Sequence, residues 1–434
     1  MASRPTKRLS RRDFLKTSSF VIASAALAAC AAPAATQPAA GQPTAKPADT
    51  KAPAATTAPA AQPTPVPTAA VNNYGKADGA ITIWHGLGGA DGAVFATMMG
   101  MFADQNKDQG IRSELYNWDV FFQKFPTAVA AGTPPDVALF HAAEVPQMAT
   151  QGMVVPMDDL YPQMGIPKDD FVKTVMDAIT VNGKTMAVPF DNHGWNCYVN
   201  TKVIKDAGLD PTKLPKNGTE FIEFANKVVV DESGKHPTES GFNPDKTKVW
   251  ALHFSWPRFT MPSTWFQFGT AAYDAKANKA TIDSEKSTAA VQYWYDLMYK
   301  YKVVPPALPG VPGSYDIFKT NSLAIMWDGT WSLGFFKENP DVEKVTIAVD
   351  FTSLAPDGKQ AQKIDSHILS IPTGVKADGV KRATTLIKWL SDNGKTWATS
   401  GQIPARLSVQ KDPLVQGIWS GKAAAESFAK FGQT

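Results

Sequence analysis

Cysteine is scarce in this sequence, which holds only Cys30 and Cys197 among its 434 residues. If Cys30 is chemically modified, no disulfide can form within the chain, so the fold must be stabilised by a packed core rather than by covalent cross-links. Long apolar runs are also lacking. The run at residues 20–29 falls well short of the roughly 18 apolar residues that suggest a membrane-spanning helix, and no later segment is long enough.

An excess of positive charge is missing once the N-terminal segment is set apart. Residues 1–29 contain six Lys or Arg and one Asp, so the rest of the chain carries a formal charge of −2 instead of the +3 of the whole. A surface that binds nucleic acid needs a basic patch, and no such patch remains in the sequence. We therefore expect no nucleic-acid partner.

Common catalytic motifs are incomplete or missing as well. The segment Thr330–Gly334 lacks the first glycine of a nucleophile elbow, and no phosphate-binding loop ending in Lys-Ser or Lys-Thr occurs. The loop Gly86–Gly89 lacks that lysine too and predicts a tight turn from a strand into a helix. The acidic pairs Asp158–Asp159 and Asp169–Asp170 are typical of solvated helix starts rather than of a glycosidase. We therefore expect that the protein is not an enzyme. A secreted hydrolase would require catalytic residues that only the fold brings together.

The N-terminus carries two motifs in a meaningful order. Residues 10–16 (Ser-Arg-Arg-Asp-Phe-Leu-Lys) resemble a twin-arginine export signal, and residues 27–30 (Leu-Ala-Ala-Cys) resemble a bacterial lipobox. The resemblance implies a signal peptide over residues 1–29, cleavage before Cys30 and acylation of the Cys30 thiol. The mature protein would then be lipid-anchored to the cell membrane on its extracytoplasmic face.

A segment rich in Ala, Pro, Thr and Gln follows Cys30 and contains no aromatic residue between positions 31 and 70. Such a composition cannot bury a core, and its frequent prolines favour an extended chain. We predict a tether over residues 30–75 that holds a folded domain away from the membrane.

The remaining sequence alternates between strand and helix patterns and is too long for one typical core. Predicted strands at 81–85, 111–116 and 137–140 are separated by predicted helices at 93–103 and 120–131. This alternation is typical of parallel β-α-β units, so we predict an α/β protein with two domains.

A second helical region is predicted further along the chain. Asn217 or Thr219 can cap a helix over residues 220–229. Ser284 can cap a longer helix, which has Trp294 on its apolar face. We expect that tryptophan to lie in the core of the second domain.

Four segments carry the patterns of one known family in that family's order: Ala131–Val137, Tyr198–Pro211, Phe318–Trp331 and Gln402–Arg406. Together they resemble extracellular solute-binding protein family 1, the maltose-binding-like sugar-binding components of ABC importers. The resemblance implies a two-lobed fold like that of periplasmic binding proteins, with discontinuous lobes joined by a hinge. We assign lobe 1 to residues 80–192 plus 326–366 and lobe 2 to residues 193–325 plus 367–434, with crossings near 191–195, 321–327 and 365–369.

The sequence departs from the family pattern just before its return crossing. Where the family has a glycine, this chain has Asn321. Asparagine tolerates left-handed backbone better than most residues, so we expect the turn to be preserved.

The same resemblance implies a function outside the cytoplasm. The protein would capture a carbohydrate in the cleft between its lobes and deliver it to an ABC permease. We expect it to act as a monomer without a cofactor.

Aromatic and polar side chains cluster at the ends of predicted strands, where open parallel sheets bind their ligands. Aromatic faces suit the C–H groups of a sugar ring, and polar groups must pair with its hydroxyls. Flanking prolines place Trp256 and Trp265 in a predicted loop, where they would bind the ligand from lobe 2. The predicted ligand-binding residues are Trp84, His85, Trp118, Phe140, His141, Asp191, Trp195, Trp256, Trp265, Asp328, Trp331 and Arg406.

Two other ligands stay open at this point. Relatives in the same family bind glycerol phosphate esters, although the sequence places no obvious cluster of Arg or Lys to hold a phosphate. His85, His141 and His193 each lie near a predicted cleft edge, and three imidazoles can bind zinc. No two of these histidines have ligand spacing along one element, and the twelve tryptophans have no part in metal chemistry. Carbohydrate is therefore the favoured ligand.

Overall fold

The computed structural model describes residues 69–274, 277, 279–308, 310–350 and 353–433. The predicted signal peptide, Cys30 and most of the predicted tether lie outside the described residues. The end of that tether is not a spacer, because Ala70–Gly75 forms strand β1 and pairs antiparallel with β3 (Gly110–Leu115). The tether boundary at residue 75 and the start of lobe 1 at residue 80 are therefore wrong. Most β1 side chains are exposed, so backbone pairing rather than an apolar pattern holds this strand.

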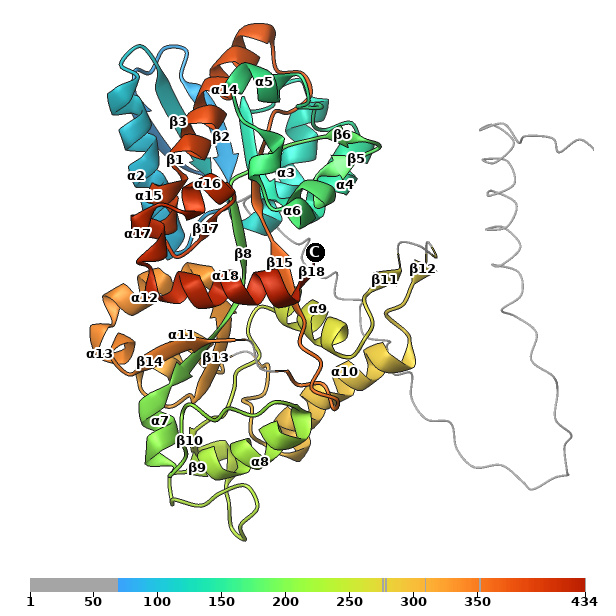
Figure 1. Ribbon diagram of the computed structural model, residues 1–434, viewed down its shortest axis with the longest axis vertical. Helices are drawn as coiled ribbons and strands as arrows, with labels where there is room; N and C mark the ends of the chain where they lie inside the picture. Colours follow the sequence, from blue (N-terminus) through green and yellow to red (C-terminus); the bar gives the residue numbers. More distant parts are fainter. Residues whose placement is uncertain (1–68, 275–276, 278, 309, 351–352, 434) are drawn as a thin grey trace, which may run out of the picture. The chain divides into compact units, whose positions relative to one another are not determined.

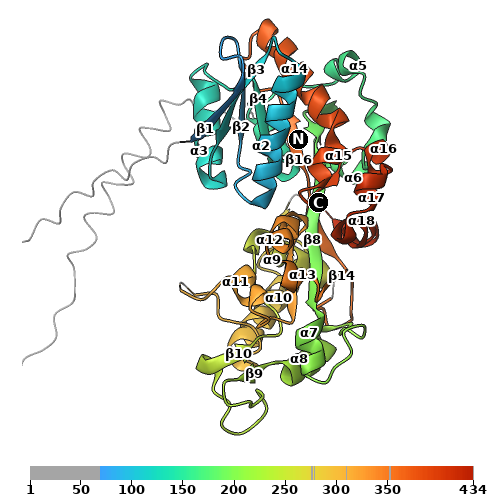
Figure 2. The same ribbon diagram turned by 90° about the vertical axis from the view of Figure 1, so that its left-hand side faces the viewer.

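Six strands form a first sheet in the order β1-β3-β2-β4-β16-β7 (Figure 1). The strands not yet bounded are β2 (Ile81–His85), β4 (Val137–His141), β7 (Val188–Pro189) and β16 (His367–Ser370). β2 pairs in parallel with β3 and β4, whereas β16 pairs antiparallel with β4 and β7. Helices α2 (Ala90–Gln105) and α14 (Ala377–Asp392) cover one face, and α3 (Trp118–Ala130) packs on the other (Figure 2).

The predicted alternation of strands and helices is confirmed in this sheet. α2 buries Phe95, Met98 and Phe102 against the strands, at the spacing of one helix face. Asn117 caps α3, because its side chain accepts a hydrogen bond from the Asp119 N–H. This cap starts the helix directly after β3 and puts Trp118 at the edge of the sheet.

A second sheet is built around β8 (Asp191–Asn200), which pairs with several strands along its length. Its other strands are β13 (Ile325–Gly329), β14 (Thr346–Val349), β15 (Gln362–Asp365), β17 (Ile403–Pro404) and β18 (Gly432–Gln433). The main helices on this side are α7 (Thr201–Asp206), α8 (Gly218–Val228), α9 (Pro257–Gln267), α10 (Glu285–Tyr295) and α18 (Trp419–Phe431). Each sheet has its own core, so we call the first sheet with its helices lobe 1 and the second lobe 2. The predicted two-lobed α/β fold is confirmed.

Two segments lie in the opposite lobe from the one predicted. Residues 326–366, predicted for lobe 1, carry most of β13 and all of β14 and β15, which belong to lobe 2. The start of residues 367–434, predicted for lobe 2, carries β16 and α14 and packs in the core of lobe 1. The cause is long-range pairing, because β13 pairs with β8 and β16 pairs with β4. A buried strand does not reveal its partner through its own apolar pattern.

The chain passes between the lobes at three places. It enters lobe 2 between β7 and β8 and returns between β15 and β16, close to the predicted crossings at 191–195 and 365–369. The crossing predicted near 321–327 is wrong, because β13 stays within the second sheet. The third passage instead follows β17, which pairs with Asp191 and Asn192 of β8, and leads to α18 (Figure 1).

Several local predictions are confirmed in lobe 2. Asn217 caps α8 and Ser284 caps α10, each by accepting a hydrogen bond from a backbone N–H. Trp294 is buried in the core of this lobe. Asn321 has a left-handed φ of +56°, and its side-chain oxygen accepts a hydrogen bond from Asn200 at 2.9 Å.

The loop predicted around Trp256 and Trp265 is wrong. Pro257 occupies the first turn of α9 and Pro262 lies inside that helix. Proline is tolerated in a first turn, where its missing N–H would have no helical partner. Trp256 precedes the helix with a left-handed φ of +44°, and its side chain is 52% exposed.

Shorter elements complete the fold. In lobe 1 and at the passage to α18 they are η1 (Ala142–Glu144), α4 (Val145–Thr150), α5 (Leu160–Met164), η2 (Lys168–Asp170), α6 (Lys173–Ala178), β5 (Thr180–Val181), β6 (Lys184–Thr185), α15 (Gly394–Ala398), α16 (Leu407–Gln410) and α17 (Pro413–Gln416). In lobe 2 they are β9 (Val230–Asp231), η3 (Pro244–Lys246), β10 (Thr247–Val249), β11 (Tyr273–Asp274), β12 (Lys279–Ala280), η4 (Asp296–Lys300), α11 (Ser314–Lys319), η5 (Thr330–Ser332), α12 (Leu333–Glu338) and α13 (Pro340–Glu343). Within the described ranges, every helix is too short or too polar to cross a membrane.

Candidate functional site

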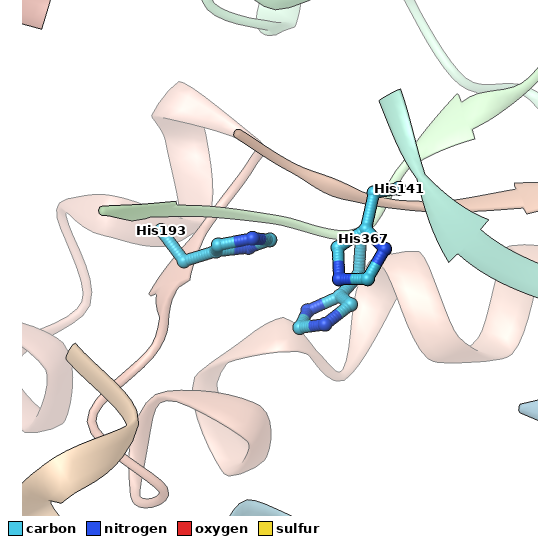
Figure 3. Close-up of side chains that lie close together, drawn as sticks. All are labelled: His141, His193 and His367. Atoms are coloured by element: carbon cyan, nitrogen blue, oxygen red, sulfur yellow. The ribbon is translucent and has the colours of Figure 1, made fainter. Parts of the chain in front are cut away.

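Three histidines meet where the strands pass between the lobes (Figure 3). His141 ends β4, His193 lies in β8 and His367 begins β16, and all three are buried. The ring centroids of His367 lie 5.0 Å from His141 and 4.3 Å from His193. The sequence predicted His141 and His193 at a cleft edge but missed His367, which comes from the antiparallel partner of β4.

Asp191 joins two of these histidines. Its Oδ1 accepts hydrogen bonds from His193 Nδ1 at 2.8 Å and from the His367 backbone N–H at 2.9 Å. Its Oδ2 accepts from His367 Nδ1 at 2.7 Å and from Trp397 Nε1 at 2.8 Å. Burial alone would raise the pKa of Asp191, but the charges and hydrogen bonds of the two histidines hold that pKa well below its ordinary value. The carboxylate is therefore ionised and saturated with donors.

The Asp191 charge also acts on the histidines. Burial favours neutral imidazole at all three positions and lowers the pKa of His141 and of His193. His367 is the exception, because the attraction of Asp191 outweighs burial and raises its pKa. Among the three, His367 is the one that most readily balances the buried carboxylate.

A continuous row of rings runs from lobe 1 to lobe 2. It contains Trp118, His141, His367, His193, Trp331 and Trp256, and we call it the aromatic row. Trp118 packs on His141 at 4.3 Å between ring centroids, and Trp331 lies 6.0 Å from His193 and 5.9 Å from Trp256. Trp118 and Trp331 are partly buried, whereas Trp256 is mostly open to solvent. The indoles at both ends of the row are thus at least partly exposed, while its centre is polar and buried.

Charged side chains link the two lobes beside the aromatic row. Arg258 of α9 donates to Glu144 of η1 at 2.6 Å, so this ion pair connects lobe 2 to lobe 1. Lys363 donates to the buried Asp365 at 3.1 Å and lies over the ring of Phe259 at 4.6 Å. Burial raises the pKa of Glu144 to about 7, although Arg258 opposes that shift. The positive charges of Arg258 and Lys363 therefore offset the negative charges of the two carboxylates.

Asp328 holds the Trp256 indole through a hydrogen bond. Its carboxylate is fully buried and accepts a hydrogen bond from Trp256 Nε1 at 3.3 Å. Ser314, Tyr315 and the Gly329 N–H also donate to it. Burial raises the pKa of Asp328 to about 6 despite these donors. Asp328 therefore orients an exposed indole and is itself out of contact with solvent.

This carboxylate gives a pH-dependent expectation. The folded state keeps the Asp328 proton up to about pH 6, whereas the unfolded chain releases it near pH 4. The contribution of this group to stability should therefore fall as the pH rises from about 4 to 6. Asp328→Asn should remove that fall. Urea unfolding at pH 4, 5, 6 and 7 would measure it against the exposed Asp177→Asn as control, and parallel pH profiles for the wild type and Asp328→Asn would contradict it.

The remaining predicted site residues are placed apart from the aromatic row or beneath it. Phe140 and Trp195 are fully buried in the two cores, so they offer no ring face to a solute. His85 is held by Ser113 and packs on Phe95, and burial lowers its pKa to about 3. His367, and not His85, completes the cluster with His141 and His193.

The other three predicted residues are not part of the aromatic row. Trp84 packs on Tyr116 within lobe 1, and Trp265 is partly buried along α9. The Arg406 guanidinium donates to Asp170 at 2.8 Å and to Asp392 at 2.6 Å, so its charge is already compensated within lobe 1. Of the predicted residues, the strand crossings therefore gather Trp118, His141, Asp191, Trp256, Asp328 and Trp331.

Comparison with known proteins places this geometry in context. The sequence profile of the bacterial extracellular solute-binding proteins matches residues 97–425. The chain is 22% identical over 363 residues to an arabinooligosaccharide-binding protein of Halalkalibacterium halodurans, which covers 78% of this chain and 77% of that protein. Maltose-bound MalE3 of T. maritima has a TM-score of 0.68 at 22% identity, over 82% of this chain and 89% of that one. UgpB of Mycobacterium tuberculosis in complex with glycerophosphocholine has a TM-score of 0.67 at 20% identity, over 82% and 88% of the two chains.

Proposed function

Because the chain belongs to the family of bacterial extracellular solute-binding proteins, we propose that it is the carbohydrate-binding component of an ABC importer. The family consists of binding proteins that act outside the cytoplasm. In this proposal the protein works as a monomer and without enzymatic activity. It captures its solute between the lobes and presents the closed form to the permease.

The aromatic row is the observation that carries the proposal. Trp118 on lobe 1 and Trp331 and Trp256 on lobe 2 present partly or largely accessible indoles on either side of the crossing strands. The apolar C–H face of a sugar ring packs well on such indoles, whose faces carry partial negative charge. The polar groups between them, among them Arg258 and Glu144, can pair with hydroxyls that would otherwise lose their hydrogen bonds to water.

Indoles on both lobes also suggest how binding changes the shape of the protein. A solute that touches both lobes favours the closed state only by its difference in affinity for the closed and open states. Moving the population from 1:99 to 99:1 requires about 5.5 kcal/mol of that difference. Contacts on Trp118 and Trp331 together can contribute to it, whereas a solute bound to one lobe alone cannot close the protein.

A ligand panel tests this proposal. Mature protein should be screened by thermal shift against monosaccharides, maltodextrins and arabinooligosaccharides, and the best ligand then followed by small-angle scattering. We expect one sugar class to raise the melting temperature and to reduce the radius of gyration. If no sugar raises the melting temperature, the proposed ligand class is wrong. If the stabilising sugar leaves the radius of gyration unchanged, lobe closure is wrong.

A glycerophosphodiester is the second candidate ligand, and one observation favours it. Arg258 pairs with Glu144 beside His141, and Lys363 lies over the ring of Phe259. Cations of this kind can hold a phosphate. UgpB, whose fold is similar, is solved with glycerophosphocholine. However, Glu144 and Asp365 already pair with the two cations, so a phosphate would have to displace these carboxylates. The panel should include glycerophosphocholine, and a shift with it alone would favour this candidate over carbohydrate.

We also propose that Cys30 is acylated and tethers the protein to the cell membrane. The tether would keep the binding lobes outside the cytoplasm and close to the permease. Because the lipid is the only membrane attachment that the sequence predicts, Cys30→Ser should give folded protein that is released from the membrane fraction. Fractionation of producing cells, with Cys197→Ser as the matched control, measures the release. Retention of Cys30→Ser in membranes after a high-salt wash would contradict lipid anchoring.

A further inference from the structure

We propose that His141, His193 and His367 bind one transition-metal ion, with Zn²⁺ as the favoured ion, at the point where the strands cross between the lobes (Figure 3). This proposal goes beyond solute binding and does not depend on which solute the protein carries. Four observations support it: the positions of the ligand atoms, the carboxylate that orients two of the rings, an unpartnered nitrogen of His141 and the local charge.

The ligand atoms are already gathered. One ring nitrogen from each of the three histidines lies within 4.8 Å of the other two. Zn²⁺ binds imidazole nitrogen at about 2.0–2.1 Å, which places tetrahedral ligand atoms about 3.3 Å apart. The histidines lie on three different strands, so their backbones are fixed by the first and second sheets. Modest rotation of the side chains is then enough to close the site around an ion.

Asp191 is a carboxylate of the kind to which zinc-binding histidines usually donate their other ring N–H. It accepts hydrogen bonds from Nδ1 of both His193 and His367. A carboxylate on Nδ1 fixes the ring orientation and leaves the lone pair on Nε2, the atom that would bind the metal. Trp397 Nε1 donates to the same carboxylate and holds it in place. Two of the three ligands are therefore oriented before any ion arrives.

His141 supplies the third ligand and has a free position. Its side chain is only 7% exposed, yet its Nδ1 has no hydrogen-bond partner among the described residues. The closest carboxylate oxygen, Oε2 of Glu144, is 3.6 Å from His141 Nδ1, beyond hydrogen-bond distance. Buried polar atoms nearly always have a partner, so this nitrogen is available for one. A metal ion would provide the missing partner.

The local charge favours a cation. Asp191, Asp365 and Glu144 bring three carboxylates to this region, whereas Arg258 and Lys363 bring two fixed cations. Once His367 binds the ion as a neutral imidazole, three carboxylates face two cations, and a divalent ion would offset the excess of negative charge. Imidazole ligands select zinc, copper or nickel over magnesium and calcium, which prefer oxygen. Three protein ligands also leave a fourth position for water.

Metal titration of untagged mature protein tests the site. After treatment with EDTA and dialysis, Zn²⁺ should bind with a stoichiometry of one by calorimetry and should raise the melting temperature. Co²⁺ should give the visible absorption of a four-coordinate site with nitrogen ligands, and Mg²⁺ should give neither signal. Metal content by mass spectrometry before EDTA treatment would show whether an ion is retained from the cell.

His141→Gln is the decisive variant, because it removes a ligand whose Nδ1 makes no hydrogen bond within the described part of the chain. We expect it to fold normally and to bind Zn²⁺ at least tenfold more weakly, with His367→Gln as a second test. His236→Gln, at a partly buried histidine of lobe 2 whose ring bonds to the Val229 carbonyl, is the matched control and should bind as the wild type does. Equal Zn²⁺ affinity for His141→Gln and the wild type, or no stoichiometric binding, would overturn the metal site. Because no sugar enters the titration, its outcome is independent of the solute panel.

Discussion

Replacing Asp191 with alanine is expected to lower the free energy of unfolding by about 3–5 kcal/mol, the usual effect of removing one partner from a buried charge pair. Four donors would lose their acceptor at once: Nδ1 of His193, Nδ1 and the backbone N–H of His367, and Nε1 of Trp397. These donors come from β8, β16 and α15, so the loss would loosen the contact between the lobes as well as each strand. Urea unfolding at pH 7, without sugar and in the presence of EDTA, measures the effect.

Two further variants are needed to interpret that measurement. Asp177→Ala removes an exposed carboxylate that pairs with Lys173 on its own helix, and should change stability by less than about 1 kcal/mol. Asp191→Asn keeps the volume of the side chain but loses its charge and one acceptor oxygen. Its free energy of unfolding should lie between those of Asp177→Ala and Asp191→Ala. If Asp191→Ala unfolds within about 1 kcal/mol of the wild type, the buried network contributes little to stability and its role has to be sought in binding.

Trp331→Ala should weaken binding of the best sugar in the panel roughly tenfold to hundredfold, or about 1–3 kcal/mol. Trp331 lies in the middle of the lobe 2 half of the aromatic row, with Phe259 at 5.5 Å and Trp256 at 5.9 Å between ring centroids. Removing its indole takes away apolar area that we expect to cover one face of the sugar. Calorimetric titration of both proteins with that sugar measures the change.

Stability must be measured on the same variant, because a tryptophan of the core behaves differently. Truncating a core tryptophan costs about 3–5 kcal/mol of stability, while the fraction that remains folded binds normally. Trp389→Ala is a suitable control, since this partly buried indole packs on Phe102 and donates to Gln105 in lobe 1. If Trp331→Ala loses several kcal/mol of stability and its folded fraction binds with unchanged affinity, Trp331 belongs to the core and not to the binding site.

Local patterns in the sequence were sufficient to predict several elements of the fold. Apolar spacing located β2, α2 and β4, and the polar caps at Asn217 and Ser284 marked two helix starts, because these signals arise from residues close together in the chain. The lobe to which a later strand belongs depends on a partner far away. β13 and β16 are both short and buried, and only their pairing with β8 and β4 decides between the lobes.

The same limit applies to the candidate site. Successive side chains of a strand point to opposite faces, so Phe140 and His141 could not both reach the aromatic row. The prediction included both, and the structure buries Phe140 in the core of lobe 1. His367 was missed because its neighbours in the row come from β4 and β8. Its signal was a run of polar residues, Asp365-Ser366-His367, inside an otherwise apolar strand pattern.

Strand β8 begins beside lobe 1 and ends deep in lobe 2, and its first residues also hold the histidine cluster. If the lobes turn about this strand, atoms near the axis travel only a short distance, whereas the outer surfaces travel far in proportion to their distance from it. The crossing strands can therefore keep their hydrogen bonds while the outer faces of the lobes move through large arcs. A permease that touches both outer faces would detect a large displacement, even though the side chains around Asp191 hardly move.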